Sequence, residues 1–168
     1  MGCRSCHGVG LHIAWEVRSC KSRYFSIEDS KIQKLANERI LHKAGYIVLN
    51  AADGEEALRL AREKIPDIVL LDMLLPKLGG REVMRALRAD PPTAMIPVLV
   101  FSSLPQANEV KLKDEGAAGY FEKSRLVENA GIGERELIQL IESLVRKSRE
   151  RSKLAGQTNS VATAAGVG

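Results

Sequence analysis

The sequence predicts an α/β fold in which five strands of a parallel sheet alternate with five helices. Two observations support this prediction. Short apolar runs recur along the chain, and the segments between them carry apolar residues three and four positions apart. The clearest run, 68–71, has four consecutive apolar residues and is typical of a strand buried on both faces. Alternation of this kind favours right-handed crossovers and therefore parallel strands.

Five segments are expected to form strands because they are short and rich in β-branched or aromatic residues. They are 24–27, 46–49, 68–71, 97–101 and 117–121. Turn-forming residues separate several of them from the neighbouring helices, as at Gly45 and at Asp53-Gly54.

The expected helices lie between these strands and after the last one, where apolar residues follow a helical spacing. They lie around 31–43, 54–61, 83–90, 106–115 and 137–145. A helix that ends before Pro91 fits the restriction that proline places on the residue before it.

Length and charge narrow the class of protein. The 168 residues suit one domain with some additional chain. The net charge of +4 is misleading, because residues 24–145 carry 16 basic and 19 acidic side chains and the basic excess lies at the two ends. A nucleic-acid-binding domain usually has a basic face on its folded part, so no nucleic-acid partner is expected.

No apolar run reaches the roughly 20 residues of a membrane span, so we expect a cytoplasmic protein without a membrane partner.

Three parts of the chain are expected. Residues 1–22 read as a flexible extension, residues 23–152 as the folded domain, and residues 153–168, which are small and polar, as a disordered tail. The extension contains Cys3, Cys6 and His7 in a C-x-x-C-H pattern, which is typical of haem attachment. Because that chemistry requires export and no export signal precedes it, a chance match is favoured over a haem or redox role.

Polar side chains follow four of the predicted strands. Glu28 and Asp29 follow the first, Asp72 the third and Lys123 the fifth, while the fourth is followed by Ser102. In a parallel sheet the carboxyl ends of the strands share one edge, where ligands of α/β proteins bind. The sequence therefore predicts that these side chains converge.

Carboxylates gathered in one pocket repel one another, which raises the pKa of at least one of them unless a cation is present. Oxygen ligands with room for water suit Mg²⁺. Asp72 can then act as a nucleophile toward phosphorus and form an aspartyl phosphate. The Lys123 ammonium and the Ser102 hydroxyl would stabilise the phosphoryl oxygens. The alternative, an ordinary Asp at a strand end, leaves the other aligned groups unexplained.

From about residue 23 to 144 the chain resembles the receiver domain of two-component response regulators. The resemblance rests on motifs that occur in the order typical of that family: Ile27-Glu28-Asp29-Ser30, Ala44-Gly45-Tyr46-Ile47-Val48, Asp53-Gly54-Glu55-Glu56-Ala57-Leu58, Pro66-Asp67-Ile68-Val69-Leu70-Leu71-Asp72, Pro97-Val98-Leu99-Val100-Phe101-Ser102 and Gly116-Ala117-Ala118-Gly119-Tyr120-Phe121-Glu122-Lys123.

This resemblance implies a flavodoxin-like, doubly wound sheet of strand order 2-1-3-4-5. It implies that a sensor histidine kinase or phosphotransfer protein transfers a phosphoryl group to Asp72, and that the protein is a self-catalysed phosphoacceptor rather than an enzyme. By the same resemblance Mg²⁺ is bound by Asp72, Asp29, Glu28 through water, and the main-chain carbonyl of Leu74. Ser102 and Tyr120 would form the switch pair.

The chain departs from the family pattern after the lysine. Family members usually have a proline there, joined by a cis bond, whereas Ser124 follows Lys123 in this chain. A cis bond to a residue other than proline costs about 2.5–4 kcal/mol, so either a trans bond or a strained loop is expected. The segment 124–133 is also longer than is usual.

Both departures fall on the face formed by the fourth helix, the fifth strand and the final helix, which the resemblance implies for output. The downstream protein stays unidentified, and homodimerisation remains open. A pseudo-receiver that binds partners without phosphotransfer is the alternative function, although the complete acidic set speaks against it.

Overall fold

The computed structural model describes residues 23–27, 31–51, 53–75, 77–103, 109–128 and 131–162. Within these residues five parallel strands form one sheet in the order β2-β1-β3-β4-β5, which confirms the predicted topology. The strands are β1 (Arg23–Ile27), β2 (Ile47–Ala51), β3 (Ile68–Leu71), β4 (Val98–Ser102) and β5 (Gly119–Glu122).

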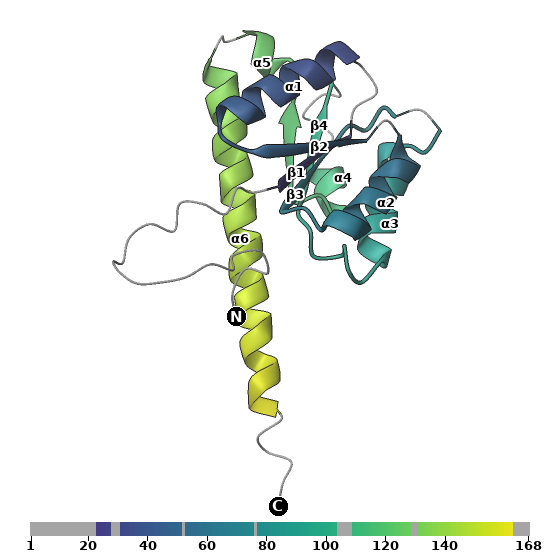
Figure 1. Cartoon of the computed structure of the whole chain (residues 1–168), viewed down its shortest axis with the longest axis vertical. Helices are drawn as coiled ribbons and strands as arrows, with labels where there is room; N and C mark the ends of the chain where they lie inside the picture. Colours follow the sequence, from purple (N-terminus) through teal and green to yellow (C-terminus); the bar gives the residue numbers. More distant parts are fainter. Residues whose placement is uncertain are drawn as a thin grey trace, which may run out of the picture.

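Helices cover both faces of this sheet (Figure 1). They are α1 (Lys31–Lys43), α2 (Gly54–Lys64), α3 (Gly80–Ala89), α4 (Glu109–Asp114), α5 (Arg125–Glu128) and α6 (Ile132–Ala162). Helices α1 and α6 cover one face, and α2, α3 and α4 cover the other. This is the doubly wound arrangement that the resemblance to receiver domains implies.

The central strand β3 shows how the sequence produces these layers. Successive side chains of a strand point to opposite faces. Val69 and Leu71 pack in the core under α2, α3 and α4, whereas Ile68 and Leu70 pack in the core under α1 and α6. All four side chains are buried, so the uninterrupted apolar run reflects burial on both faces.

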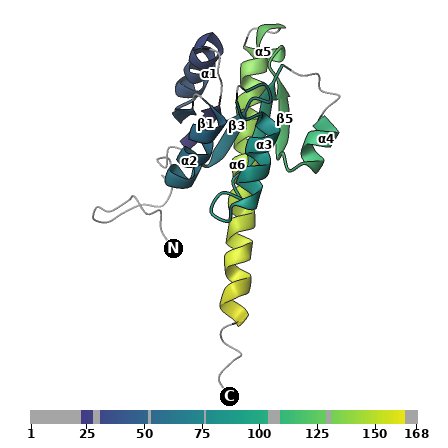
Figure 2. The same cartoon turned by 90° about the vertical axis from the view of Figure 1, so that its right-hand side faces the viewer.

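The carboxyl-terminal third differs from the prediction in two ways. A one-turn helix, α5, forms within the expected loop 124–133. Helix α6 continues to Ala162 and projects well beyond the sheet (Figure 2). The prediction of disorder from residue 153 therefore needs correction for 153–162. Once packing has offset the cost of helix nucleation, each further residue is added at little cost, and no proline interrupts this stretch. None of the helices in the described segments has both the length and the apolar content needed to cross a bilayer.

Candidate functional site

Asp72 directly follows β3, at the carboxyl edge of the sheet, and its side chain is buried. Its backbone N–H donates to the Ile27 carbonyl (3.3 Å), which continues the pairing of β3 with β1. The backbone N–H of Leu74 donates to Asp72 Oδ1 (3.1 Å), as in an Asx turn. The backbone therefore fixes the carboxylate where the chain leaves the sheet.

Two further strand ends bring polar side chains to this carboxylate. Lys123 Nζ lies 2.5 Å from Asp72 Oδ2, and the Ser102 hydroxyl donates to Asp72 Oδ1 (3.1 Å). All three side chains are buried. The pairing of β4 with β5 fixes the two donors relative to each other, because the Lys123 backbone N–H donates to the Ser102 carbonyl (3.0 Å). The structure thus brings together the residues predicted at the ends of β3, β4 and β5; their chemical roles remain predictions.

An aromatic contact supports the lysine. The Lys123 ammonium lies 5.4 Å from the ring centroid of Phe101, within the range of a cation–π interaction. Phe101 in turn stacks on Phe121 at 6.0 Å between centroids. The sequence predicts both phenylalanines as strand residues, but nothing in the apolar pattern indicates that one of them lies beside the lysine.

Gly80, at the start of α3, approaches the backbone at Asp72 closely. A Cβ atom at this position would lie 2.7 Å from Met73 Cα and closer still to the Asp72 carbonyl oxygen. Only glycine lets the helix start so near the end of β3. The sequence gives no signal that one of the two adjacent glycines, Gly79 and Gly80, supports the acidic residue.

The loop after Asp72 is also tied to α2. Asp53 caps α2 by accepting from the Glu56 backbone N–H (3.0 Å), and it forms an ion pair with Lys77 Nζ (2.8 Å). The backbone hydrogen bond from Glu56 and the contact with Lys77 both lower the pKa of Asp53. The spacing of Asp53 and Glu56 fits a helix-capping pattern, a signal that could have identified the cap but not its lysine partner.

The predicted metal ligands are only partly described. Glu28 and Asp29 lie outside the described residues, as do Cys3, Cys6 and His7. In the part of the chain that the structure describes, no three acidic, histidine or cysteine side chains group to hold a metal. The described residues place one candidate oxygen ligand at this edge, the buried carboxylate of Asp72, which follows the pairing of Leu71 with Ile27 at the end of β1. A carboxylate is a ligand that suits Mg²⁺.

Tyr120 lies on β5 and is 7% exposed, packed in the core under α2, α3 and α4. Burial raises the pKa of its phenol, and Glu122 and Glu109 add to that shift. The peptide bond from Lys123 to Ser124 is trans, one of the two geometries expected. The Ser124 hydroxyl donates to Glu122 Oε1 (2.8 Å) across this turn.

Comparisons with known proteins agree with this geometry. The family model described as "Response regulator receiver domain" matches residues 25–130. Protein PilH of Pseudomonas aeruginosa is 34% identical over 103 residues, which cover 61% of this chain and 85% of PilH. The DNA-binding dual master transcriptional regulator RpaA of Synechocystis is 37% identical over 109 residues, covering 64% of this chain but only 42% of RpaA.

A solved structure resembles the whole fold. It is the receiver domain of the sensor histidine kinase PA1611 from Pseudomonas aeruginosa, with a magnesium ion coordinated in its active-site cleft. The two chains share 25% identity and superpose with a TM-score of 0.63, over 74% of this chain and 97% of the other.

Proposed function

We propose that this chain, which belongs to the response regulator receiver domain family, is a switch controlled by phosphorylation of Asp72. The phosphoryl donor would be a sensor histidine kinase or a phosphotransfer protein. The observation that carries this proposal is the contact of one buried carboxylate with both Lys123 and Ser102. On this proposal the protein is cytoplasmic and acts without nucleic acid or membrane.

The transfer forms a bond from an Asp72 oxygen to phosphorus while the bond from phosphorus to the donor histidine nitrogen breaks. Such a reaction depends mainly on alignment and on neutralisation of charge. The Leu74 backbone N–H and the Ser102 hydroxyl both bind Oδ1 and so orient the carboxylate. Oδ2 contacts the end of the flexible Lys123 side chain, which can move aside, so we assign Oδ2 as the attacking atom.

Lys123 has a second role once the bond forms. Its ammonium can move from Asp72 Oδ2 to a phosphoryl oxygen without leaving the site, and there it balances the added negative charge. Asp72, Asp29, Glu28 and the Leu74 carbonyl would bind Mg²⁺, which when bound supplies further neutralisation of the phosphoryl oxygens. Carboxylate and carbonyl oxygens are the ligands that this ion prefers.

Ser102 and Tyr120 would pass the change to partners. In the pairing of β4 with β5, Ser102 is opposite Glu122 and Val100 is opposite Tyr120, so Ser102 and Tyr120 have the same strand parity and face the same side. When the Ser102 hydroxyl turns from Asp72 to the phosphoryl group, space opens next to Tyr120, and its ring follows. The surface of α4, β5 and α6 then changes its partner binding.

The test is incubation with acetyl phosphate and Mg²⁺, followed by intact mass measurement. We expect one phosphoryl adduct on the wild-type chain, none on Asp72→Asn, and a strong reduction when EDTA removes the metal. Asp53→Asn is the matched control, because it makes the same substitution at a more exposed carboxylate that pairs with a different lysine, and it should retain the adduct. A folded wild-type chain that gains no adduct would instead support the pseudo-receiver.

A further inference from the structure

A groove of about 410 Å³ lies at the other end of the sheet from Asp72. It is formed by the last turn of α3, the end of α4, the segments leading into β4 and β5, and the middle of α6. Its position at the amino ends of the strands separates it from the phosphoacceptor site. Four cationic residues line this basic groove: Arg88, Lys113, Lys147 and Arg151.

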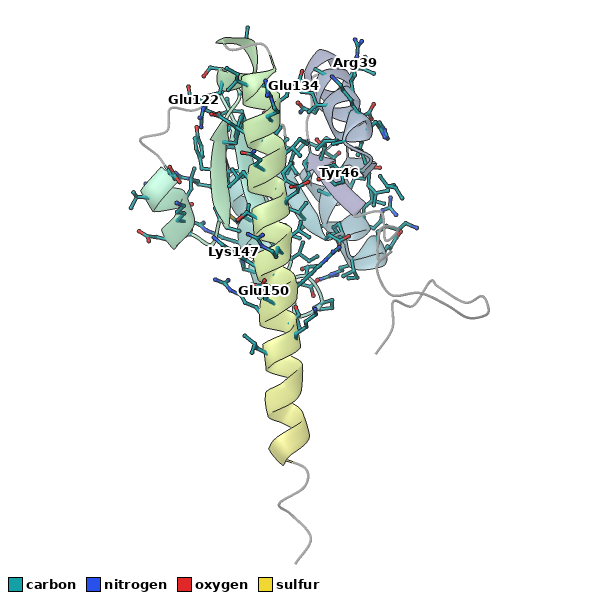
Figure 3. The ribbon with its side chains drawn as sticks, turned by 90° about the vertical axis from the view of Figure 1, so that its left-hand side faces the viewer. Arg39, Tyr46, Glu122, Glu134, Lys147 and Glu150 are labelled. Atoms are coloured by element: carbon teal, nitrogen blue, oxygen red, sulfur yellow. The ribbon has the colours of Figure 1, made fainter. Side chains whose placement is uncertain are left out.

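The positive charge of the basic groove is poorly balanced. None of the described residues that line it is acidic. Lys147 and Arg151 are exposed, lie one turn apart on α6, and have no carboxylate partner in the described part of the chain. Arg149, on the same helix, is by contrast paired with Asp67 (2.8 Å). Figure 3 shows Lys147 on the side of α6 that is next to α4.

Arg88 adds a cation that is partly buried. Its guanidinium donates to the carbonyls of Ala94, Ile96 and Gly116 at 2.9–3.2 Å. Burial lowers the pKa of this guanidinium, because removing the cation from water disfavours its charged form. Lys113 differs from the other three cations in that it forms an ion pair, with Glu109 at 2.6 Å. A bound anion would therefore supply a counter-charge that the described residues of the groove lack.

The basic groove also offers apolar surface. Ile96 and Leu144 form part of its wall, and the Met95 side chain is 62% exposed beside them. Methionine is a flexible side chain that adapts to planar or irregular ligands. Pockets of a few hundred Å³ with apolar walls and a few polar groups are typical of small-molecule sites.

We propose that the basic groove binds a phosphorylated organic anion of about nucleotide size. Its phosphates lie between Lys147 and Arg151, and its organic part packs against Met95. Cations that converge from three helices on one concavity favour a compact ligand over an extended polymer. The proposal does not depend on phosphorylation of Asp72.

The test is calorimetric titration of the full chain with ADP in the presence of EDTA, which keeps divalent metal from bridging the nucleotide to the Asp72 edge. We expect saturable binding to one site. Lys147→Gln and Arg151→Gln should each weaken it about tenfold, since each removes a charge-assisted hydrogen bond. The matched control is Arg146→Gln, which removes the same charge from the neighbouring position, where the side chain lines a separate pocket with Tyr46 and Glu142. Its affinity should stay within twofold of the wild type.

Two further ligands test the two halves of the site. Pyrophosphate should bind more weakly than ADP, and adenosine should not bind measurably. Absence of ADP binding at millimolar concentration would overturn the proposal. An equal loss of ADP affinity in Arg146→Gln would also overturn it, because it would indicate only general charge attraction. So would pyrophosphate binding as tight as that of ADP, because the apolar wall would then contribute nothing.

Discussion

Lys123 Nζ and Asp72 Oδ2 form an ion pair of 2.5 Å in which both side chains are less than one-tenth exposed. Either charge alone would be costly to bury, so in a pair this little exposed each charge offsets the desolvation cost of the other. The Phe101 ring next to the ammonium adds a second, weaker attraction. We therefore expect this contact to contribute both to the stability of the fold and to the proposed phosphoryl transfer.

Replacing Lys123 should affect both properties. We expect Lys123→Met to lower the free energy of unfolding by about 3 kcal/mol, because the Asp72 charge stays buried without its partner. Acetyl phosphate labelling should also slow at least tenfold, since no ammonium balances the phosphoryl group. Urea denaturation and time-resolved mass measurement check the two effects.

The double variant Lys123→Met with Asp72→Asn is the control for the stability effect. It should regain part of the lost stability, because both charges are then absent. A single Lys123→Met variant as stable as the wild type would mean that water, rather than the lysine, compensates Asp72.

The two adjacent glycines before α3 should respond differently to alanine. A Cβ at Gly80 meets the backbone of Asp72 and Met73, whereas one at Gly79 meets only the end of the flexible Glu82 side chain. We expect Gly80→Ala to destabilise the fold by about 1–3 kcal/mol and to slow labelling of Asp72, as overpacking usually does. Gly79→Ala should stay near the wild type. Equal effects of the two substitutions would contradict the close approach of Gly80.

The Asp53 cap predicts a pH dependence. The backbone N–H of Glu56 and the Lys77 ammonium depress the pKa of Asp53 in the folded state. Because its pKa is lower in the folded state, ionised Asp53 stabilises the fold at pH values above its unfolded-state pKa of about 4. This stabilisation is lost as the pH falls through the lower pKa of the folded state. Asp53→Asn keeps a capping acceptor but has no charge. We expect the wild type to be more stable than this variant at pH 7, and urea denaturation should show this difference shrinking as the pH falls below about 4. A difference that persists in acid would show that the charge is not its source.

Ile65 ends α2 in a left-handed conformation, with φ of 42° and ψ of 71°. This backbone region is strained for a β-branched residue and suits asparagine or glycine better. Because the side chain is 44% exposed, little packing is lost on replacement. We expect Ile65→Asn to raise the free energy of unfolding by about 0.5–1 kcal/mol in thermal or urea denaturation. Ile65→Ala should give no comparable gain, and equal gains would place the effect elsewhere.

The order of the elements and the central part of the site could be predicted because both follow from short-range patterns. The apolar runs at 68–71 and 97–101 give the strands, and parallel pairing brings Asp72, Ser102 and Lys123 to one edge. The left-handed Ile65 could not be predicted, since isoleucine normally signals a strand and tertiary packing overrides that preference.

Other features depend on distances that no local pattern encodes. The nearness of Gly80 to Asp72 and the pairing of Lys77 with Asp53 arise only when α3 and the preceding loop pack on the sheet. Composition underestimates the extent of α6, because it indicates disorder for 153–168, whereas the docked part of the helix nucleates its own continuation to Ala162. Glu28 and Asp29 lie outside the described residues, so their place at the site stays a prediction.

The side chains of β3 alternate between the two cores, and this alternation fixes the pairing register that positions Asp72. Sliding this strand by one residue against β1 or β4 would exchange the side chains of the two cores and carry Asp72 to the wrong side of the sheet at the same time. Chain slippage that misplaces the carboxylate is therefore penalised by four buried aliphatic side chains. A protein in which this core is intact therefore has the Asp72 carboxylate at the carboxyl edge of the sheet.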